Sequence, residues 1–232
     1  MKIGIIGSST VAQTLATKLL EVGHSVTISS RDTSQAKDRG AMGVVASADD
    51  WAAEQRGKGY EAAAAGFADT AASSELVINA TAGTGSLAAL QAAGPGNLRG
   101  KILVDVSNPL DFSHGMPPTL SVCNTDSMGE QIQAAFPETR VVKTLNTVTA
   151  ALMVDPGRLA EETDIFVAGN DAAAKEWVAQ QFLREWLGWA RVIDLGDITA
   201  ARGTEMYLPL WLRLWGSTGT GILNVRLVVG QG

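Results

Sequence analysis

The first 31 residues alternate between strand and helix in an order that few folds share. An apolar run at residues 2–6 is followed by Gly7, by a segment with an amphipathic helical pattern, and by a second apolar run at residues 25–28. This is the βαβ unit that opens nucleotide-binding α/β folds. In such a unit the helix N-terminus lies beside the turn and attracts phosphate. We therefore expect a nucleotide to bind across the turn that begins at Gly7.

The turn departs at one position from the usual glycine-rich pattern. Against the spacing G-x-G-x-x-G/A the chain reads GSSTVA from Gly7, so Ser9 occupies the place of the second glycine, which normally lets the backbone approach the pyrophosphate. The hydroxyls of Ser8, Ser9 and Thr10 can cap the helix or bind phosphate. The alternative is a capped helix in a protein that binds no nucleotide.

The end of the second strand indicates which nucleotide binds. A carboxylate there would hold the ribose hydroxyls of NAD, but the chain has Ser29, Ser30 and Arg31 at this point, about 20 residues after the turn. Hydroxyls and a guanidinium suit the 2′-phosphate of NADP, which arginine binds through two parallel hydrogen bonds. These residues predict an NADP(H) site.

Charge and cysteine content exclude several classes of protein. The 232 residues carry a net charge of -6, whereas a protein that binds nucleic acid presents a basic face. A single cysteine, Cys123, gives no disulfide framework and favours a reducing cytoplasm. Residues 120–123 predict a buried strand, so we expect this thiol to pack rather than react.

The sequence predicts neither export nor membrane insertion. Met1 leads directly into the first strand, with no charged segment, apolar run and cleavage site before it. The most apolar C-terminal stretch, residues 207–215, is interrupted by Pro209 and Arg213 and is far shorter than the ~20 residues of a membrane span. We expect a cytoplasmic protein without a membrane or nucleic-acid partner.

Apolar runs alternate with helical segments along the rest of the chain. Strands are predicted at residues 42–46, 75–80, 101–106, 140–144, 164–168 and 190–194, and helices at residues 51–72, 86–93, 127–136 and 172–187. This alternation is typical of an α/β fold with a doubly wound parallel sheet. We predict a Rossmann-type core at residues 1–145. Residues 146–232 are predicted to form a compact α/β part that packs on it and ends in an apolar, tryptophan-rich helix.

Small polar residues follow the ends of five predicted strands. Because ligands of a parallel sheet lie beyond the carboxyl ends of its strands, these segments are expected to form one crevice. Asn108 and Asn146 are the candidates for positioning a reacting ring, although residues 81–85 and Pro109 also fit a plain helix entry and a plain turn. The predicted cofactor-binding residues are Gly7, Ser8, Ser9, Thr10, Val11, Ser29, Ser30, Arg31, Thr81, Ala82, Gly83, Ser107, Asn108, Pro109 and Asn146.

Few side chains are available for acid, base or metal chemistry. We expect His24 to be exposed in a turn and His114 to lie in a loop, and neither has carboxylates at ligand spacing, so no metal site is predicted. Tyr207 has no lysine at helical spacing. Lys143 lies near the rim, and we interpret it as a solvated strand residue. Hydride transfer between NADP(H) and a second redox ring needs mainly alignment, which makes it the favoured chemistry.

Several stretches resemble the coenzyme F420-dependent NADP oxidoreductase family. They are GHSVTISSRD at residues 23–32, VDVSNPLDF at residues 104–112 and VKTLNT at residues 142–147. The stretch ARGTEMYLPLW at residues 201–211 is similar to the actinobacterial branch of that family. The resemblance spans nearly the whole chain, and the combination is far more specific than any single motif.

The resemblance implies a Rossmann fold with a compact C-terminal part, a homodimer, and hydride transfer between NADPH and the deazaflavin F420. It implies that Thr10 lies at the pyrophosphate and that Ser30 and Arg31 hold the 2′-phosphate. The residues that it implies beside the nicotinamide and the partner ring are Asn108, Pro109 and Asn146. The family's glycine is missing at Ser9, which bears on how tightly the pyrophosphate binds.

The C-terminal helix can be interpreted without the family. Residues 199–215 carry two apolar stripes at helical spacing, formed by Met206, Leu210 and Leu214 and by Tyr207, Trp211 and Trp215. Pro209 predicts a kink or the start of a second helix. One stripe can cover the sheet while the other meets a second subunit or covers the crevice; an ordinary core helix is the alternative. Arg202 and Glu205 are expected to pair locally.

The sequence thus predicts an NADP-dependent oxidoreductase that transfers hydride between NADPH and F420 or a flavin-like small molecule. One alternative is an imine or carbonyl reductase in which Lys143 or water supplies a proton. The other is a sensor that binds NADP without turnover.

Overall fold

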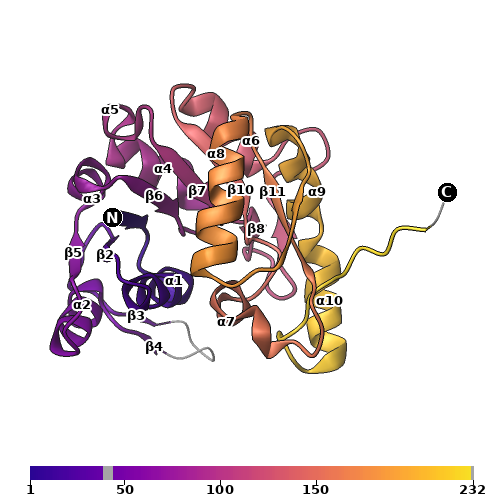
Figure 1. Ribbon diagram of the computed structural model, residues 1–232, viewed down its shortest axis with the longest axis horizontal. Coiled ribbons are helices and arrows are strands. Elements are labelled where there is room, and N and C mark those ends of the chain that lie inside the picture. Colours follow the sequence, from indigo (N-terminus) through magenta and orange to yellow (C-terminus); the bar gives the residue numbers. More distant parts are fainter. Residues whose placement is uncertain (39–43, 231–232) are drawn as a thin grey trace.

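A computed structural model describes residues 1–38 and 44–230. The strands of its main sheet are β1 (Lys2–Ile6), β2 (Ser25–Ser29), β5 (Ala62–Ala65), β6 (Leu76–Asn79), β7 (Ile102–Asp105), β10 (Arg140–Thr144), β11 (Asp164–Ala168) and β12 (Arg191–Asp194). Within the described residues these eight strands lie in the order β12-β11-β10-β7-β6-β1-β2-β5 (Figure 1). From β5 to β10 this is the order of a Rossmann fold, with the strand order reversing between β1 and β6.

Pairing in this sheet is parallel except where β11 meets β10. The register of β1 places Ile6 beside Ser29 of β2 and Asn79 of β6, so these strands end together at one rim. β7 runs parallel to both β6 and β10 and ends at the same rim. β11 runs antiparallel to β10, and β12 is parallel to β11. The predicted α/β fold with a doubly wound, mainly parallel sheet is confirmed.

Helices cover both faces of the sheet. On one face lie α1 (Thr10–Glu21), α2 (Ala48–Gly57), α7 (Ala150–Val154), α8 (Ala172–Trp177) and its continuation η3 (Val178–Trp186). On the other lie α3 (Phe67–Ser73), α4 (Gly83–Ala93), α5 (Pro95–Leu98) and α6 (Met128–Ala135). In α1 the buried residues Leu15, Ala16 and Leu19 form one face against the sheet. Each such leucine contributes roughly 1.5–3 kcal/mol by burial.

Residues 51–72 differ from their predicted helical structure. They contain the end of α2, the edge strand β5 and α3. Alanine favours helix intrinsically, which explains the prediction for the run Ala62–Ala65. Pairing with β2 outweighs that preference, and Gly59, with φ of 89°, ends the helical stretch before it.

Three other local predictions are corrected. The strand predicted at residues 42–46 begins outside the described residues, and its remainder, β4 (Val44–Val45), pairs with β3 (Lys37–Asp38) apart from the main sheet. Cys123 is exposed, because the strand before it, β9 (Thr119–Leu120), ends early and pairs only with β8 (Leu110–Asp111). His24 is half-buried, since its ring packs on Trp186 with 4.1 Å between centroids.

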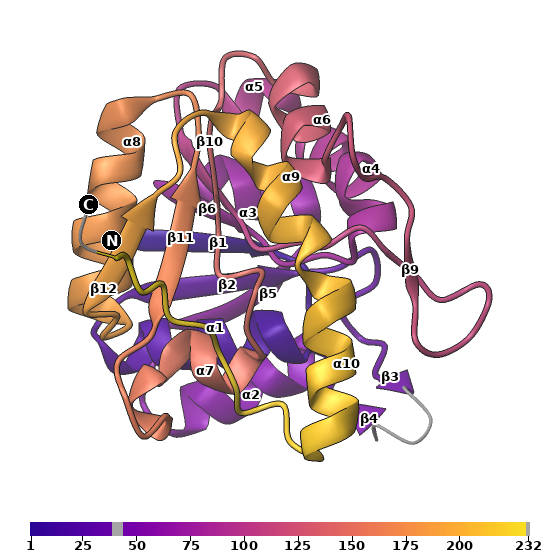
Figure 2. The same cartoon turned by 90° about the vertical axis from the view of Figure 1, so that its right-hand side faces the viewer.

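The C-terminal helical segment is two helices. After the short turn η4 (Ile198–Ala200), α9 (Ala201–Met206) is followed by α10 (Leu208–Thr218), with Pro209 in the first turn of α10. Figure 2 shows α9 beside α6 and α10 continuing down the same side of the molecule. The proline therefore marks a new helix. Among the described helices none combines the length and apolarity of a membrane span.

The loops after β6 and β7 approach each other at Gly83. Its backbone N–H donates to the Asn108 carbonyl oxygen at 3.1 Å. A Cβ atom on Gly83 would lie 2.1 Å from that oxygen and 2.9 Å from Cα of Pro109. Only glycine allows this contact, which holds Asn108 and Pro109 against the start of α4.

We expect Gly83→Ala to lower the free energy of unfolding by about 1–3 kcal/mol, because the clashing atoms belong to the backbone and cannot rotate away. The matched control is Gly85→Ala, in the same helical turn, where a Cβ would have no neighbour within 4 Å. Alanine is the better helix former, so this variant is expected to gain up to about 1 kcal/mol. Urea unfolding measures the free energy of unfolding of both variants. Equal midpoints for the two would contradict the close backbone contact assigned to Gly83.

Candidate active site

A cavity of about 300 Å³ opens beyond the ends of β1, β6, β7 and β10, and we call it the rim crevice. Residues from four of the five predicted strand ends line it. The predicted residues that line it are Ser9, Thr10, Val11, Thr81, Ala82, Ser107, Asn108 and Asn146. The remaining predicted residues, Gly7, Ser8, Ser29, Ser30, Arg31, Gly83 and Pro109, lie outside its lining.

The turn after β1 depends on Gly7. Its φ is 129°, and a Cβ there would lie 2.7 Å from the Ala80 carbonyl oxygen, so a side chain does not fit. Ser9 caps α1 by accepting from the Ala12 N–H at 3.4 Å, and its hydroxyl donates to the same Ala80 oxygen at 3.3 Å. The residue in place of the second glycine is thus a helix cap that also ties α1 to β6.

The N-terminus of α1 faces the rim crevice. The first N–H groups of a helix have no partner within it, and Thr10 and Val11, the first two residues of α1, both line the cavity. These amides and the positive end of the helix dipole favour an anion. This is the geometry that a pyrophosphate requires.

The three residues at the end of β2 have different environments. Ser29 is fully buried, and its hydroxyl donates to the Ile5 carbonyl at 2.9 Å, so this side chain belongs to the sheet. The Ser30 hydroxyl donates to the Asp32 carbonyl at 2.6 Å. Arg31 is exposed at the rim, next to the turn at Gly7, whose backbone pairs with Ser29. Of the three, Arg31 is the one whose side chain is exposed.

Asn108 and Asn146 form a reciprocal pair. The Asn108 side-chain amide donates to the Asn146 carbonyl at 2.8 Å, and the Asn146 amide donates to Oδ1 of Asn108 at 3.0 Å. Leu145, just before Asn146, is buried in the left-handed conformation with φ of 60°. That conformation is unfavourable for leucine, and here it turns the chain so that Asn146 lines the crevice.

Lys143 corrects the prediction of a solvated lysine. Its ammonium is fully buried and donates to Oδ2 of Asp105 at 2.8 Å, to Oε1 of Glu205 at 2.8 Å and to the Ser107 carbonyl at 2.6 Å. Burial disfavours the charged form, but the charges of Asp105 and Glu205 outweigh it and raise the pKa of Lys143 above its ordinary value. All three protons are engaged, so Lys143 does not donate one to a ligand.

The predicted local pair of Arg202 and Glu205 is also wrong. Arg202 pairs with Glu130 of α6 at 2.5 Å, whereas Glu205 points inward to Lys143. The two residues lie on different faces of α9, one half-exposed and one buried.

The rim crevice has an apolar wall whose residues are absent from the predicted cofactor-binding residues. Its members are Leu110, Phe112, Val148, Met153, Leu208 and Trp211. Cover of the crevice by one apolar stripe of the C-terminal helix is among the predicted options, and Trp211, from one of the two stripes, does line the cavity. β8, with two residues, is too short for a strand pattern.

Three residues of the crevice carry a buried polar atom without a hydrogen-bond partner in the described part of the chain. They are Ser107 through Oγ, Thr147 through Oγ1 and Trp211 through Nε1. Unpaired buried polar atoms are unfavourable, so these three atoms mark places where the protein beside the crevice is not fully hydrogen-bonded.

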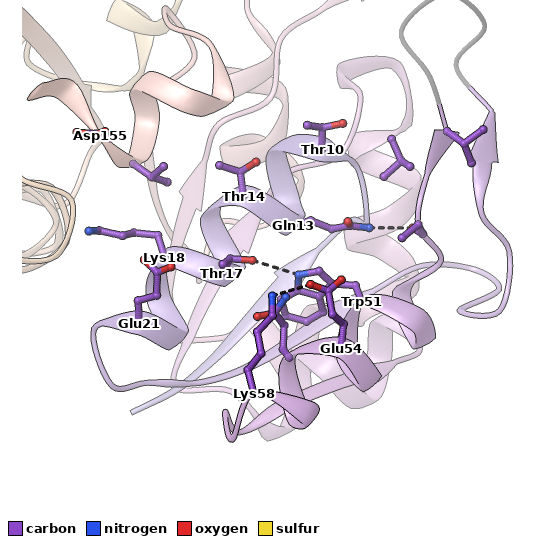
Figure 3. A pocket seen from close by; sticks show the side chains of 15 residues that line it. Thr10, Gln13, Thr14, Thr17, Lys18, Glu21, Trp51, Glu54, Lys58 and Asp155 are labelled. Carbon is purple, nitrogen blue, oxygen red and sulfur yellow. Dashed lines mark hydrogen bonds and ion pairs between the residues drawn. The ribbon is translucent and has the colours of Figure 1, made fainter. Parts of the chain in front are cut away.

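A second cavity, of about 710 Å³, runs along the outer side of α1 (Figure 3). Two pairs of its lining side chains bond to each other: Trp51 donates to Thr17 at 3.2 Å, and Lys58 pairs with Glu54 at 2.6 Å. Thr10 is the only predicted site residue among those lining it. The predicted chemistry therefore belongs to the rim crevice.

Comparison with solved structures shows a close match. A crystal structure from Arthrobacter sp. FB24, provisionally named an F420-dependent NADP reductase, is 54% identical over 99% of this chain and 100% of that chain, with a TM-score of 0.89. A reductive aminase from Aspergillus terreus, in complex with NADPH and ethyl levulinate, is 18% identical over 94% of this chain and 62% of that chain, with a TM-score of 0.60. The second likeness concerns the fold alone.

Two sequence comparisons extend this result. The rat metalloreductase STEAP3 is 28% identical over 215 residues, which are 90% of this chain but 38% of that protein, so the chain spans well under half of this relative. A family model described as NADP oxidoreductase, coenzyme F420-dependent, matches residues 2–109. Together with the match along the whole Arthrobacter chain, it shows that this protein belongs to the coenzyme F420-dependent NADP oxidoreductase family.

Proposed function

We propose that this protein transfers hydride between NADPH and a deazaflavin of the F420 type or a flavin-like ring. The observation that carries the proposal is the composition of the rim crevice, in which every lining side chain is uncharged. Its apolar wall suits a planar ring. Transfer between two stacked rings requires alignment at close distance rather than a strong acid or base. The Arthrobacter relative, which is provisionally named an F420-dependent NADP reductase, supports the same acceptor.

In this proposal the residues of the chain bind, orient and exclude water. The N–H groups of Thr10 and Val11 hold the pyrophosphate, and Arg31 holds the 2′-phosphate. Bound NADPH supplies a hydride, which with one proton from water reduces the acceptor ring and leaves NADP⁺. The pair of Asn108 and Asn146 orients the reacting ring, and the apolar wall keeps bulk water from the gap.

The imine and carbonyl reductase alternative is less well supported. Such a reaction needs a proton donor beside the substrate, and Lys143 is buried outside the crevice with its three protons engaged. Water is the donor that remains for this alternative. The sensor alternative predicts nucleotide binding without any acceptor chemistry.

We expect rapid oxidation of NADPH in the presence of F420, slower or no oxidation with FMN or FAD, and little with NADH in place of NADPH. The nicotinamide absorbance of NADPH, followed over time with each acceptor in turn, measures the rate of oxidation directly. A panel with cyclic imines and ketones tests the first alternative. Turnover of an imine without turnover of any ring would contradict the proposal, and binding without turnover of either would favour the sensor.

Arg31→Ala is expected to weaken NADPH binding by about 10- to 100-fold, because a charged hydrogen bond to phosphate is worth ~1.5–3 kcal/mol. Binding of NADH, which lacks the phosphate, should change little. Fluorescence titration measures both affinities. Arg99→Ala is the matched control, since Arg99 is also exposed but lies on another side, paired with Glu138 at 3.1 Å. Equal losses for NADPH and NADH would show that Arg31 does not bind the 2′-phosphate.

We also propose that a second copy of the chain covers the apolar stripe of Met206, at the end of α9, and Leu210, in α10. These two side chains are exposed, Leu210 by 56%, whereas the neighbouring Leu208 and Trp211 are buried. Exposed apolar patches of this kind mark interfaces.

Leu210→Glu is therefore expected to convert a dimer to a monomer at micromolar concentration. A carboxylate buried in an apolar contact would lose its hydration without gaining a hydrogen-bonding or charged partner, which is unfavourable. Light scattering after size exclusion measures the mass. Val22→Glu, at the exposed end of α1, is the control and should leave the mass unchanged. A wild-type protein that is monomeric at all concentrations would contradict the proposal.

A further inference from the structure

Lys143 lies beneath the rim crevice in a cluster of fully buried ions. Asp105, at the end of β7, and Glu205, in α9, each contact its ammonium at 2.8 Å, and all three side chains are at most 1% exposed. The cluster joins two parts of the molecule. Through Asp105 it contacts the ends of the strands, and through Glu205 it contacts the C-terminal helices.

On the strand side, the cluster fixes the backbone that lines the crevice. Asp105 accepts from the Ser107 N–H at 3.1 Å and from the Asn79 amide at 2.8 Å, while Lys143 donates to the Ser107 carbonyl at 2.6 Å. Asn79 in turn accepts from the Thr81 hydroxyl at 2.7 Å. Ser107 and Thr81 both line the crevice, so its nucleotide side is bonded to these ions.

On the helix side, Glu205 holds α9 and, through it, α10. Besides Lys143, it accepts from the backbone N–H groups of Met128 and Gly129 at 2.8 and 3.1 Å. Leu208, three residues later, begins the apolar wall, and Trp211 continues it one turn farther along α10. Only Tyr207 separates α9 from α10. The position of this wall therefore depends on where Glu205 is held.

Stability alone does not account for this cluster. Buried ion pairs are often no more stabilising than apolar side chains of similar size, because desolvation offsets their attraction. They do restrict geometry, since each charge must meet its particular partners. Hydride transfer depends on such restriction, because a displacement of about 1 Å costs on the order of 100-fold in rate.

We propose that Lys143 and Glu205 are positioning residues for hydride transfer: their contact sets the distance between the nucleotide side of the crevice, at Ser107, and the acceptor wall, at Leu208 and Trp211. This inference rests on the proposed function. Neither residue contacts the substrate; each acts through the elements that it holds.

The test is Glu205→Gln, which keeps the size of the side chain and one acceptor oxygen but removes one of the two negative charges that Lys143 meets. Lys143→Met is less informative, because it leaves two carboxylates buried without their cation. The matched control is Glu130→Gln, since Glu130 pairs with Arg202 and ties the same two helices, α6 and α9, without reaching the strand ends.

For Glu205→Gln we expect an NADPH dissociation constant within about twofold of wild type, together with a fall of roughly 10- to 100-fold in the rate of single-turnover hydride transfer. Amide hydrogen exchange should quicken in residues 207–212 and remain unchanged in β1 and β2. Glu130→Gln should match wild type in transfer rate. Both variants are compared at a temperature where each is fully folded.

Two results would overturn the inference. One is an unchanged transfer rate in Glu205→Gln; the other is exchange in residues 207–212 no faster than in Glu130→Gln. If the wild type itself reduces no ring, the proposed function fails, while the exchange measurement still decides whether Glu205 positions α10.

Discussion

A single buried ammonium determines how the C-terminal helices meet the Rossmann core. The ammonium of Lys143 donates three hydrogen bonds, and their acceptors belong to β7, to the turn after β7 and to α9. Removing an ion from water costs several kcal/mol unless its partners are in place, so the contacts must form together. An apolar contact between the same elements would tolerate sliding by a fraction of a turn, whereas this one does not. The position of α9, and with it that of α10, follows from this charge requirement.

Close backbone approach is the second constraint, and it acts on the strand ends. At Gly7 and at Gly83 the neighbouring carbonyl oxygen occupies the space of a side chain. These contacts bring the ends of β1, β6 and β7 together so that residues from four separate loops line one cavity. The asparagine pair then connects the loop after β7 to that after β10. The strand-end side of the crevice is thus formed by main-chain geometry, whereas its opposite side is the wall of large apolar side chains.

The parts that the sequence predicted well are those with a local cause. The order of β1, α1 and β2 follows from apolar periodicity and one glycine, and the convergence of strand ends follows from parallel topology. The strand Ala62–Ala65 was missed because its cause is pairing with β2, which no local pattern records. The burial of Lys143 was missed for the same reason, since its partner Glu205 lies on a distant helix. Trp211 was recognised as apolar, but its place in the crevice depends on that same contact.

The distribution of charge suits both the binding of an anionic nucleotide by an acidic chain and the hydride transfer that we propose. The groups suited to phosphate are Arg31 and the N-terminus of α1, which lie at the rim. There the solvent screens any part of their positive charge that a phosphate does not neutralise. Lys143 has its charge offset by two carboxylates behind the crevice. The gap between them is lined by uncharged side chains, so the reacting rings meet no competing ion and no strong acid. In such a gap a hydrogen bond to a ligand is stronger than in water, because the local dielectric constant is low. Binding strength and reactivity therefore depend on different residues, and a change at the rim need not disturb the alignment on which hydride transfer depends.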